Sequence, residues 1–327
     1  MSNKLEKIAV FTSGGDAPGM NAAIRGVVRC ALYNKLKVEG IYQGYQGMIE
    51  NKFVSLLSSS VSNIIQKGGT ILKTARSDDF MTTEGRKKAF NNLKNRGVDA
   101  LVAIGGDGTF KGAQVFYDEF KIPVIGIPGT IDNDLYGTDF TIGYDTAINT
   151  AIDAIDKIRD TADSHNRLFF VEVMGRDAGF IALRTGIGSG AEAILIPEIH
   201  TDTKMLLKKL ELGKKKSKTS SIVIVSEGDE TGGAFKIAEE VKKVFSEYDI
   251  RVSILGHIQR GGNPTCSDRV LAGRLGVAAV EALLKGETGL MVGVKHKSVT
   301  YTPFSKAIKH NNTIDKDLFE LNEILSF

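Results

Sequence analysis

Short apolar runs that end in a glycine turn recur along this chain of 327 residues, and they constrain its fold most strongly. ALVAI at 100–104 leads into GGDGTFKGA, and PVIGI at 123–127 leads into PGTIDND. A run that is apolar at every position is typical of a strand buried on both faces, as in a parallel sheet. Helix-period segments, such as 18–33 and 144–159, lie between the runs. The alternation predicts an α/β fold with mostly parallel sheets.

Nine short, mostly apolar runs predict nine strands, which is more than one six-stranded sheet needs, so we expect two α/β domains. The predicted strands are Lys7–Thr12, Val38–Tyr42, Ala100–Ile104, Val124–Ile127, Leu168–Val173, Ala193–Ile196, Ile222–Val225, Val252–Leu255 and Met291–Val294. In open α/β sheets, ligands bind beyond the carboxyl ends of the strands. The glycine turns fall at these ends.

Composition excludes several classes of function. Net charge is +3, with 42 lysines and arginines scattered among 39 acids, so we expect no nucleic-acid partner. No apolar run is long enough to span a membrane, so we expect no membrane partner. Two cysteines, Cys30 and Cys266, argue against a disulfide framework and favour a cytoplasmic location.

Three glycine turns carry candidate phosphate and metal chemistry. TSGGDAPGMNAA at 12–23 is a strand–turn–helix unit whose free amides suit an anion, although a tight turn without ligand fits equally well. In GGDG, Asp107 could bind Mg²⁺ between nucleotide phosphates or simply cap a helix. In TIDND, one of Asp132 and Asp134 could activate a hydroxyl nucleophile while the other is structural or bound to a metal, or the segment could form an Asx-type turn. No GxxxxGK[ST] occurs, which excludes the P-loop class.

Two further turns offer cations after predicted strands. VEVMGRDAG at 171–179 contains Arg176, and GHIQRGG at 256–262 contains His257 and Arg260. A guanidinium can bind phosphate through two hydrogen bonds, and an imidazole can add a donor. Taken singly, such residues are more often surface ion pairs or structural histidines. GIGSGA at 186–191 matches a dinucleotide pattern but follows no predicted strand, so we reject it.

The ordered set SGGDAPGMNAAIRG, GGDG, PGTIDND, EVMGR and GHIQRGG resembles the bacterial-type 6-phosphofructokinase family over nearly the whole chain. The resemblance implies two Rossmann-like three-layer α/β/α domains. We expect an ATP-binding domain at 1–141 plus 258–302 and a fructose 6-phosphate-binding domain at 142–257 plus 303–327. It also implies a cytoplasmic, homotetrameric, allosteric kinase of glycolysis that transfers phosphate from MgATP to the C1 hydroxyl of fructose 6-phosphate.

The resemblance assigns roles to individual positions. For ATP and its phosphates these are Gly15, Tyr45, Arg76, Ser77, Gly106, Asp107, Gly108 and Thr109, with Asp107 as the Mg²⁺ ligand. For catalysis they are Asp132 as base, with Thr130, Asp134, Arg176 and Gly15. For the sugar phosphate they are Thr130, Asp132, Asp134, Met174, Gly175, Arg176, Glu227, His257 and Arg260, with Arg167 and Arg251 reaching the site of a neighbouring subunit.

The phosphoryl donor is predicted from two glycines. Members that use pyrophosphate carry an Asp and a Lys where this chain has Gly108 and Gly129, so the room left here favours ATP. GRDAGFIAL is less like the best-known ATP-dependent forms and keeps a pyrophosphate-dependent enzyme as the alternative. A non-catalytic sugar-phosphate or nucleotide sensor is the rival of another class, but such a protein should have lost Asp107 or Asp132.

An effector site for ADP or phosphoenolpyruvate is also implied by the resemblance. Its matching residues are Arg25, Arg29, Arg159, Glu192, Lys216 and Lys218. One arginine of that site is replaced here by Ser58, which removes a charge-assisted hydrogen bond to phosphate. We therefore expect weak effects of both ligands.

Overall fold

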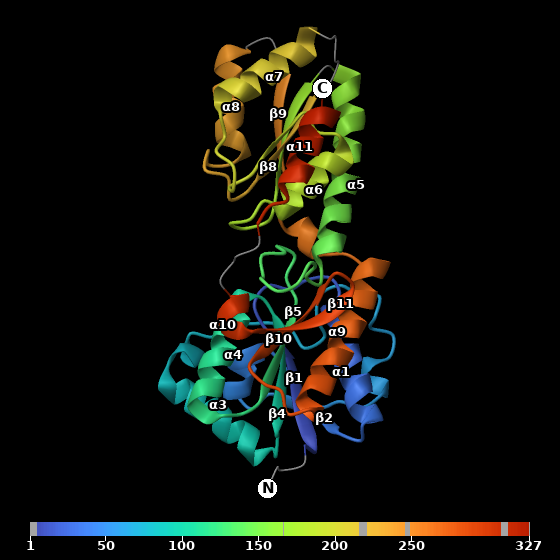
Figure 1. The fold of residues 1–327 in the computed structure, drawn as a ribbon, viewed down its shortest axis with the longest axis vertical. Helices are drawn as coiled ribbons and strands as arrows, with labels where there is room; N and C mark the ends of the chain where they lie inside the picture. Colours follow the sequence, from blue (N-terminus) through green and yellow to red (C-terminus); the bar gives the residue numbers. More distant parts are fainter. Residues whose placement is uncertain (1–4, 166, 216–220, 246–248, 309–312, 327) are drawn as a thin grey trace. The chain divides into compact units, whose positions relative to one another are not determined.

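The computed structural model describes residues 5–165, 167–215, 221–245, 249–308 and 313–326, and it divides into two compact units (Figure 1). The first unit comprises Met1–Ile131, Leu135–Thr146 and Arg260–Asn312. The second comprises Asp132–Asp134, Ala147–Gln259 and Thr313–Phe327. The first unit continues past residue 302 because Phe304 stacks on Phe110 in its core, with ring centroids 5.2 Å apart.

Within the described residues, the first unit contains a seven-stranded sheet with the order β11-β10-β5-β4-β1-β2-β3. The strands are β1 (Lys7–Thr12), β2 (Lys37–Ile41), β3 (Phe53–Ser55), β4 (Ala100–Gly105), β5 (Val124–Pro128), β10 (Leu290–Lys295) and β11 (Ser298–Pro303). The two edge strands β3 and β11 run antiparallel to their neighbours, and the other pairings are parallel. The chain moves from β1 to β2 on one side and then to β4 on the other. β1 and β4 therefore flank a topological switch point, where ligands bind in such sheets.

Helices cover both faces of this sheet (Figure 1). One face carries α1 (Met20–Tyr33) and α9 (Cys266–Leu284). The two helices approach closely at Gly26, where the absence of a side chain permits the contact: a Cβ there would lie 3.0 Å from the carbonyl oxygen of Gly273. The other face carries α2 (Gly44–Ile49), α3 (Thr83–Asn95), α4 (Asp107–Phe120) and α10 (Phe304–Ala307), whose apolar side chains join one core cluster. Short 3₁₀ turns, η1 (Ser59–Val61) and η2 (Asp79–Met81), lie between β3 and α3.

The second unit has a four-stranded parallel sheet in its described part, with the order β7-β8-β6-β9. The strands are β6 (Arg167–Val173), β7 (Ala193–Leu195), β8 (Ser221–Ser226) and β9 (Asp249–Ile254). On one face lie α7 (Thr203–Lys215) and α8 (Ala234–Val244), and on the other α5 (Tyr144–His165), α6 (Phe180–Ser189) and α11 (Lys316–Leu325) (Figure 1). η3 (Gly256–Arg260) follows β9.

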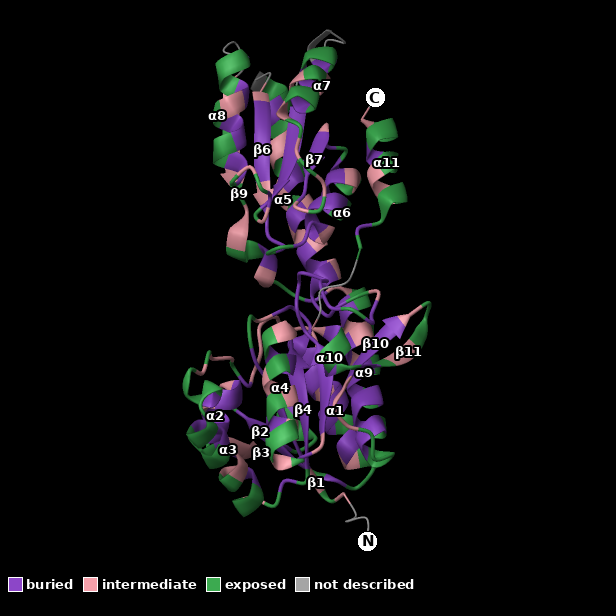
Figure 2. Ribbon diagram, turned by 60° about the vertical axis from the view of Figure 1, so that its left-hand side comes forward, coloured by how far each residue is buried: buried purple, intermediate pink, exposed green. Residues whose placement is uncertain are grey.

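The central strands of both sheets are mostly buried, as Figure 2 shows for β4 and β6. This confirms the α/β fold with mostly parallel sheets. Each of the nine predicted strands overlaps an observed one, whereas the edge strands β3 and β11 were not predicted. GIGSGA at 186–191 includes the end of α6, so it is no strand–helix turn. Among the described helices, none is both long enough and apolar enough to cross a membrane.

Candidate active site

The ends of β1, β4 and β5 are joined to one another by hydrogen bonds. The amide of Ser13 donates to the carbonyl oxygen of Ile104 at 3.0 Å, and Thr109 Oγ1 donates to the carbonyl oxygen of Ser13 at 3.1 Å. The amide of Gly129 donates to the carbonyl oxygen of Gly105 at 3.0 Å. Three of the glycine turns singled out in the sequence therefore meet at one edge of one sheet.

Gly105 at this edge is required by close approach of the backbone, and Gly15 lies close to the end of an arginine side chain. A Cβ on Gly105 would lie 2.4 Å from the carbonyl oxygen of Ser13 and 2.3 Å from Thr109 Oγ1. A Cβ on Gly15 would lie 2.5 Å from Nη1 of Arg260, whose guanidinium also donates to the carbonyl oxygen of Asp16 at 3.3 Å. Backbone amides without side-chain cover, next to a guanidinium, can receive a phosphate group.

Asp107 is the first residue of α4, directly after Gly106. Lys111, one turn along the helix, pairs with the Asp107 carboxylate at 3.2 Å, and the Asp107 side chain is 15% exposed. Around Gly108 there is open space, because a Cβ there would meet no atom within 4 Å. Mg²⁺ at nucleotide sites is commonly held by one or two carboxylates together with phosphate oxygens. An accessible carboxylate beside open space fits such an ion.

Tyr45 lies in the core. Its ring stacks on Phe80, with centroids 4.0 Å apart, and packs against Phe11 at 4.9 Å. Its hydroxyl donates to the carbonyl oxygen of Thr109 at 2.6 Å, and burial raises the pKa of the phenol. With 6% of the residue exposed, Tyr45 packs in the core and supports the first turn of α4 through its hydrogen bond to Thr109. A contact with adenine, implied by the resemblance, stays a prediction that this packing does not favour.

Arg76 and Ser77 follow on a loop beside α2. Arg76 is exposed. Ser77 Oγ donates to Gln46 Oε1 at 2.6 Å and accepts from the amide of Phe80 at 3.2 Å. The hydrogen bonds of Ser77 therefore fix the loop directly after the exposed guanidinium of Arg76.

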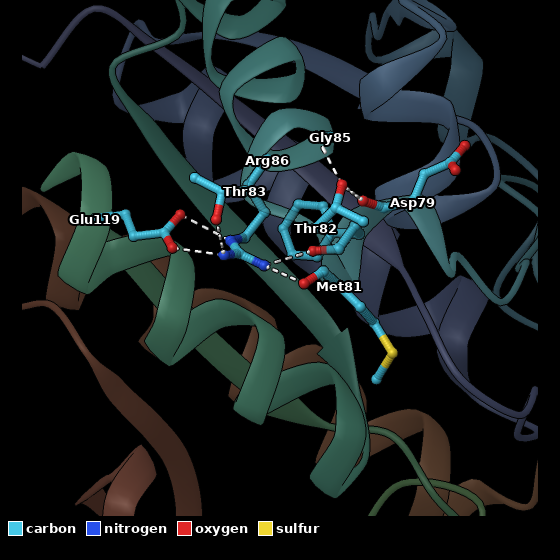
Figure 3. Close-up of polar contacts among 8 residues, drawn as sticks. Asp79, Met81, Thr82, Thr83, Gly85, Arg86 and Glu119 are labelled. Carbon is cyan, nitrogen blue, oxygen red and sulfur yellow. Dashed lines mark hydrogen bonds and ion pairs between the residues drawn. The ribbon is translucent and has the colours of Figure 1, made fainter.

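Arg86, which the sequence analysis did not single out, anchors the end of this loop (Figure 3). Its Nη1 donates to the carbonyl oxygens of Phe80 and Met81 at 3.0 and 2.8 Å. Nε and Nη2 donate to the two carboxylate oxygens of Glu119 at 2.7 and 2.6 Å. The ion pair joins α3 to α4, which begins at Asp107. An arginine on a polar helix face gives no sign of this role in the sequence.

The TIDND segment follows β5 and is buried: Thr130, Asp132 and Asp134 are each 7–8% exposed. The carbonyl oxygen of Thr130 accepts from Thr141 Oγ1 at 2.6 Å. Asn133 has a left-handed backbone with φ of 54°, a conformation that asparagine tolerates. Carboxylates in a fixed, buried turn can hold or accept a proton at a defined position.

In the second unit, the turn Met174–Arg176 follows β6 and is held by Glu227, which follows β8. Glu227 Oε1 accepts from the amides of Gly175 at 3.2 Å and Arg176 at 2.7 Å. Arg176 has a left-handed φ of 56°, and its side chain is 57% exposed. A Cβ on Gly228 would lie 2.0 Å from the carbonyl oxygen of Arg176, so only glycine fits there. The turn therefore presents an arginine to solvent from a strained backbone.

The GHIQRGG segment forms η3 and is divided between the two units after Gln259. His257 is exposed in the second unit, whereas Arg260 lies against Gly15 in the first. Gln259 was missed by the sequence analysis, although it lies inside a chosen motif. It is fully buried, and its Oε1 accepts from the amide of Met174 at 2.9 Å.

Arg167 and Arg251 lie near the amino ends of β6 and β9 and share one partner, Asp249. Nε of Arg167 lies 2.7 Å from Asp249 Oδ2, and Nη2 of Arg251 lies 3.0 Å from Oδ1. The hydrogen bond from Arg167 is the main cause that lowers the pKa of Asp249. Since β6 runs from Arg167 to Val173, Arg167 is separated from the Met174–Arg176 turn by a whole strand, about 20 Å. One chain does not bring these arginines to that turn.

The implied effector residues are spread over both units. Arg25 and Arg29 lie one turn apart on α1. Arg159 donates from Nη2 to the carbonyl oxygens of Ser189 and Gly190, and Glu192 precedes β7. Lys216 and Lys218 lie outside the described residues.

Comparison with known proteins gives matches over almost the whole chain. The family model described as Phosphofructokinase matches residues 7–283. The chain is 58% identical to ATP-dependent 6-phosphofructokinase 2 of Bacteroides thetaiotaomicron over 319 residues, covering 98% of each chain. It is 56% identical to ATP-dependent 6-phosphofructokinase of Cytophaga hutchinsonii over 322 residues, again covering 98% of each.

A solved structure agrees in fold. The phosphofructokinase of Saccharomyces cerevisiae superposes with a TM-score of 0.88 at 36% identity over 98% of this chain. The chain spans 47% of the length of that yeast chain. The sequence matches, the shared fold and the site at the switch point lead to one conclusion: the chain belongs to the phosphofructokinase family.

Proposed function

We propose that this chain is an ATP-dependent 6-phosphofructokinase, which transfers the γ-phosphoryl group of MgATP to the C1 hydroxyl of D-fructose 6-phosphate in glycolysis. The products are fructose 1,6-bisphosphate and ADP. The observation that carries the proposal is the joining of β1, β4 and β5, because it gathers the Gly15 turn, Asp107 and the start of the TIDND segment at one sheet edge. Identity above 50% to curated kinases of this name supports it.

The nucleotide side of the reaction is assigned to the first unit. Amides of the Gly14–Gly15 turn and of Gly106–Thr109 receive phosphate oxygens, and the exposed Arg76 adds charge neutralisation. Asp107 would hold Mg²⁺, which neutralises charge on the phosphates when bound. Catalysis of this kind depends on alignment and electrostatic stabilisation more than on covalent chemistry.

Asp132 is assigned as the base. The C1 oxygen of the sugar forms a bond to the γ-phosphorus while the bond from that phosphorus to the β–γ bridging oxygen breaks. The proton of the C1 hydroxyl passes to Asp132, and ADP leaves with the bridging oxygen. Thr130 and Asp134 support the position of Asp132, whose contribution as a base is about 10²–10⁴-fold.

The sugar phosphate is assigned to the turn Met174–Arg176 of the second unit, which Glu227 holds. The resemblance adds His257 of the same unit and Arg260 of the first unit to this assignment. Arg167 and Arg251 lie too far along the sheet to join that turn in the same chain. We therefore assign them to the site of a neighbouring copy, in a homotetramer. Mixing Arg251→Ala with Asp132→Ser subunits should restore part of the activity, and verified mixed tetramers without recovery would contradict the sharing.

The donor is ATP and not pyrophosphate, and the open space at Gly108 supports this assignment. The decisive experiment compares phosphorylation of fructose 6-phosphate with ATP and with pyrophosphate side by side. We expect a kcat/KM for ATP well above that for pyrophosphate. Equal values, or no phosphorylation of fructose 6-phosphate at all, would contradict the proposed function. The enzyme is proposed to act in the cytoplasm.

Regulation by ADP and phosphoenolpyruvate is proposed to be weak. Ser58, which precedes η1, stands where the resemblance implies an arginine. One lost arginine–phosphate hydrogen bond lowers affinity by about ten- to a hundredfold. Saturation curves for fructose 6-phosphate with each effector should shift only above micromolar concentrations, and a strong shift at micromolar effector would contradict the proposal.

A further inference from the structure

Asp268, near the start of α9, is a buried carboxylate with no role in the proposed reaction so far. It is 1% exposed. Its Oδ1 accepts from the amide of Gly143 at 2.8 Å, and its Oδ2 accepts from the amide and the hydroxyl of Thr146 at 2.8 and 2.5 Å. All three donors belong to the segment that starts α5, which is more than a hundred residues away in the sequence.

Asp268 acts as a cap for a helix that lacks one of its own. Helix starts are usually capped by a Ser, Thr, Asp or Asn side chain that accepts from an amide of the first turn. Gly143, the residue before α5, has no side chain, and Asp268 accepts from both Gly143 and Thr146 in its place. The start of α5 is therefore fixed by a residue of another helix.

The two helix starts cap each other. Thr265 caps α9 by accepting from the amide of Asp268 at 3.3 Å, and its own amide donates to Thr146 Oγ1 at 3.0 Å. Thr265 Oγ1 also lies 2.6 Å from Asp145 Oδ2, to which it donates. The hydroxyl of Thr146, at the start of α5, thus both donates to Asp268 and accepts from Thr265 at the start of α9. Because every member is bonded, movement of one helix start disturbs both.

Residues 141–143, which precede α5, lie beside the residues at and just after the end of β5. The amide of Ile142 donates to the carbonyl oxygen of Pro128 at 2.9 Å, and Thr141 Oγ1 donates to that of Thr130 at 2.6 Å. Gly129 and Ile142 form a parallel bridge. Residues 141–143 therefore lie between Asp268 on one side and the peptide of Thr130 on the other.

The start of α1 packs on the same place. A Cβ on Gly19 would lie 2.6 Å from Ile142 Cγ2 and 3.6 Å from Asp268 Cβ. A Cβ on Gly143 would lie 2.7 Å from Cβ of Ala17, in the turn that contains Gly15. The turn that contains Gly15 and the residues that follow β5 therefore both contact the segment 141–143, which Asp268 binds.

We propose that Asp268 is a positioning residue for phosphoryl transfer: through residues 141–143 it fixes the peptide of Thr130, and with it the TIDND turn. The inference rests on the proposed function, in which Asp132 of that turn accepts the proton. Misplacement of a reacting group by about 1 Å can cost about 10²-fold in rate. Asp268 should therefore act on kcat and leave the binding of either substrate nearly unchanged.

Asp268→Asn is the primary test. Asparagine keeps the shape of the side chain but replaces one acceptor oxygen by an NH₂ group, which would face the amide donors of Gly143 or Thr146. We expect kcat to fall about tenfold or more, with KM for ATP and fructose 6-phosphate within about threefold of the parent. The assay is run well below the unfolding temperature of each variant. A folded variant with kcat within threefold of the parent, or with a rise in KM that accounts for the whole loss, would overturn the proposal.

Thr141 gives a second test that does not depend on the folding of Asp268→Asn. Thr141→Val keeps the shape but removes the hydrogen bond to Thr130, and Thr141→Ser keeps that bond. The valine variant should lose about three- to tenfold in kcat, and the serine variant should stay within twofold. Equal kcat in the two variants would overturn the proposal.

Asp132→Ser separates this inference from the proposed function. If Asp268 acts through the TIDND turn, Asp268→Asn should cost little more in the Asp132→Ser background, because residues that act as a unit are not additive. A full additional loss there would place the effect of Asp268 elsewhere and overturn the inference. An Asp132→Ser enzyme with parental activity would instead contradict the proposed function.

Discussion

The strand ends of the two sheets are fixed in different ways. In the first unit, β1, β4 and β5 are joined by backbone amides and the Thr109 hydroxyl, and the last residue of each strand is buried. In the second unit, the turn after β6 depends on one carboxylate, Glu227, and presents an exposed arginine with a left-handed backbone. The proposed nucleotide side is thus held by backbone and hydroxyl hydrogen bonds, and the proposed sugar-phosphate side by one carboxylate side chain.

This difference predicts separate kinetic signatures for the two sheets. Changes at the buried edge should act on the chemical step, because alignment there is expressed in the transition state. Changes at the exposed turn should act on the affinity for fructose 6-phosphate, because a charged side chain and an anion meet in both the ground and transition states. A variant that moves the opposite parameter would break the comparison.

Asp132→Ser should have the largest effect. Loss of a base in the buried TIDND segment should lower kcat by about 10²–10⁴-fold, with little change in KM. Steady-state rates of the purified, folded variant measure it. Activity within about threefold of the parent would remove Asp132 from the mechanism.

Glu227→Ala should mainly raise KM for fructose 6-phosphate, by about ten- to a hundredfold. The two amides of Gly175 and Arg176 lose a charged acceptor, which is worth about 1.5–3 kcal/mol. Glu227→Gln keeps an acceptor oxygen, so its effect should be smaller. Glu230→Gln, on the same loop but bonded to Thr201, is the matched control and should change KM less than twofold. A fall in kcat with unchanged KM would contradict the assignment.

Gly108→Asp should lower kcat/KM for ATP by about tenfold or more, through steric and like-charge conflict with the nucleotide phosphates. The protein should fold normally, because a Cβ at this position meets no atom within 4 Å. Gly108→Ala adds bulk without charge and should cost less. Undiminished use of ATP by Gly108→Asp would remove Gly108 as a determinant of the donor.

Gly129 is a poorer site for the same experiment. A Cβ there would lie 3.0 Å from Ile104 Cγ2 and 3.2 Å from Met20 Cε. Gly129→Lys should therefore lower stability as well as ATP use, and thermal unfolding should show a fall in Tm that Gly108→Asp lacks. Equal Tm values for the two variants would contradict the packing argument.

Apolar runs allowed the central strands to be predicted, in one case, Lys7–Thr12, at both bounds. The edge strands β3 and β11 were missed for a physical reason. β3 has three residues, and β11 faces solvent along much of its length, so neither has a continuous apolar run. The glycine turns at the strand ends were predictable because the backbones of neighbouring turns approach each other closely there, as at Gly105 and Ser13, and glycine is the residue that fits such an approach.

Long-range partners were not predictable. Thr265 and Asp268 have the spacing of a local capping box, yet the Asp268 carboxylate binds a helix start far away in the sequence. Tyr45 has a polar end that suits a ligand, but Phe11 and Phe80 enclose its ring only after three separate segments fold together. Such pairings depend on how distant segments are brought together in the fold, which local patterns in one sequence do not reveal.

The smallest effect is expected from the Arg86–Glu119 ion pair, which joins α3 to the last turn of α4 (Figure 3). The hydrogen bond from Arg86 is the main cause that lowers the pKa of Glu119. Because the folded-state pKa is depressed, the stability from this pair is fully present above the unfolded value, about 4.3, and is lost as pH falls through the folded pKa.

Glu119→Gln should lower stability by about 0.5–1 kcal/mol at neutral pH, as expected for a partly exposed pair, and the difference from the parent should shrink below about pH 4. Urea unfolding at several pH values measures this stability difference. Asp118→Asn is the control, because Asp118 is the neighbouring residue and its carboxylate accepts hydrogen bonds from the Gln114 amide and not from Arg86. A difference that grows as the pH falls would mean that the pair does not favour the ionised glutamate, and that Arg86 anchors the Arg76 loop through the carbonyl oxygens of Phe80 and Met81 alone.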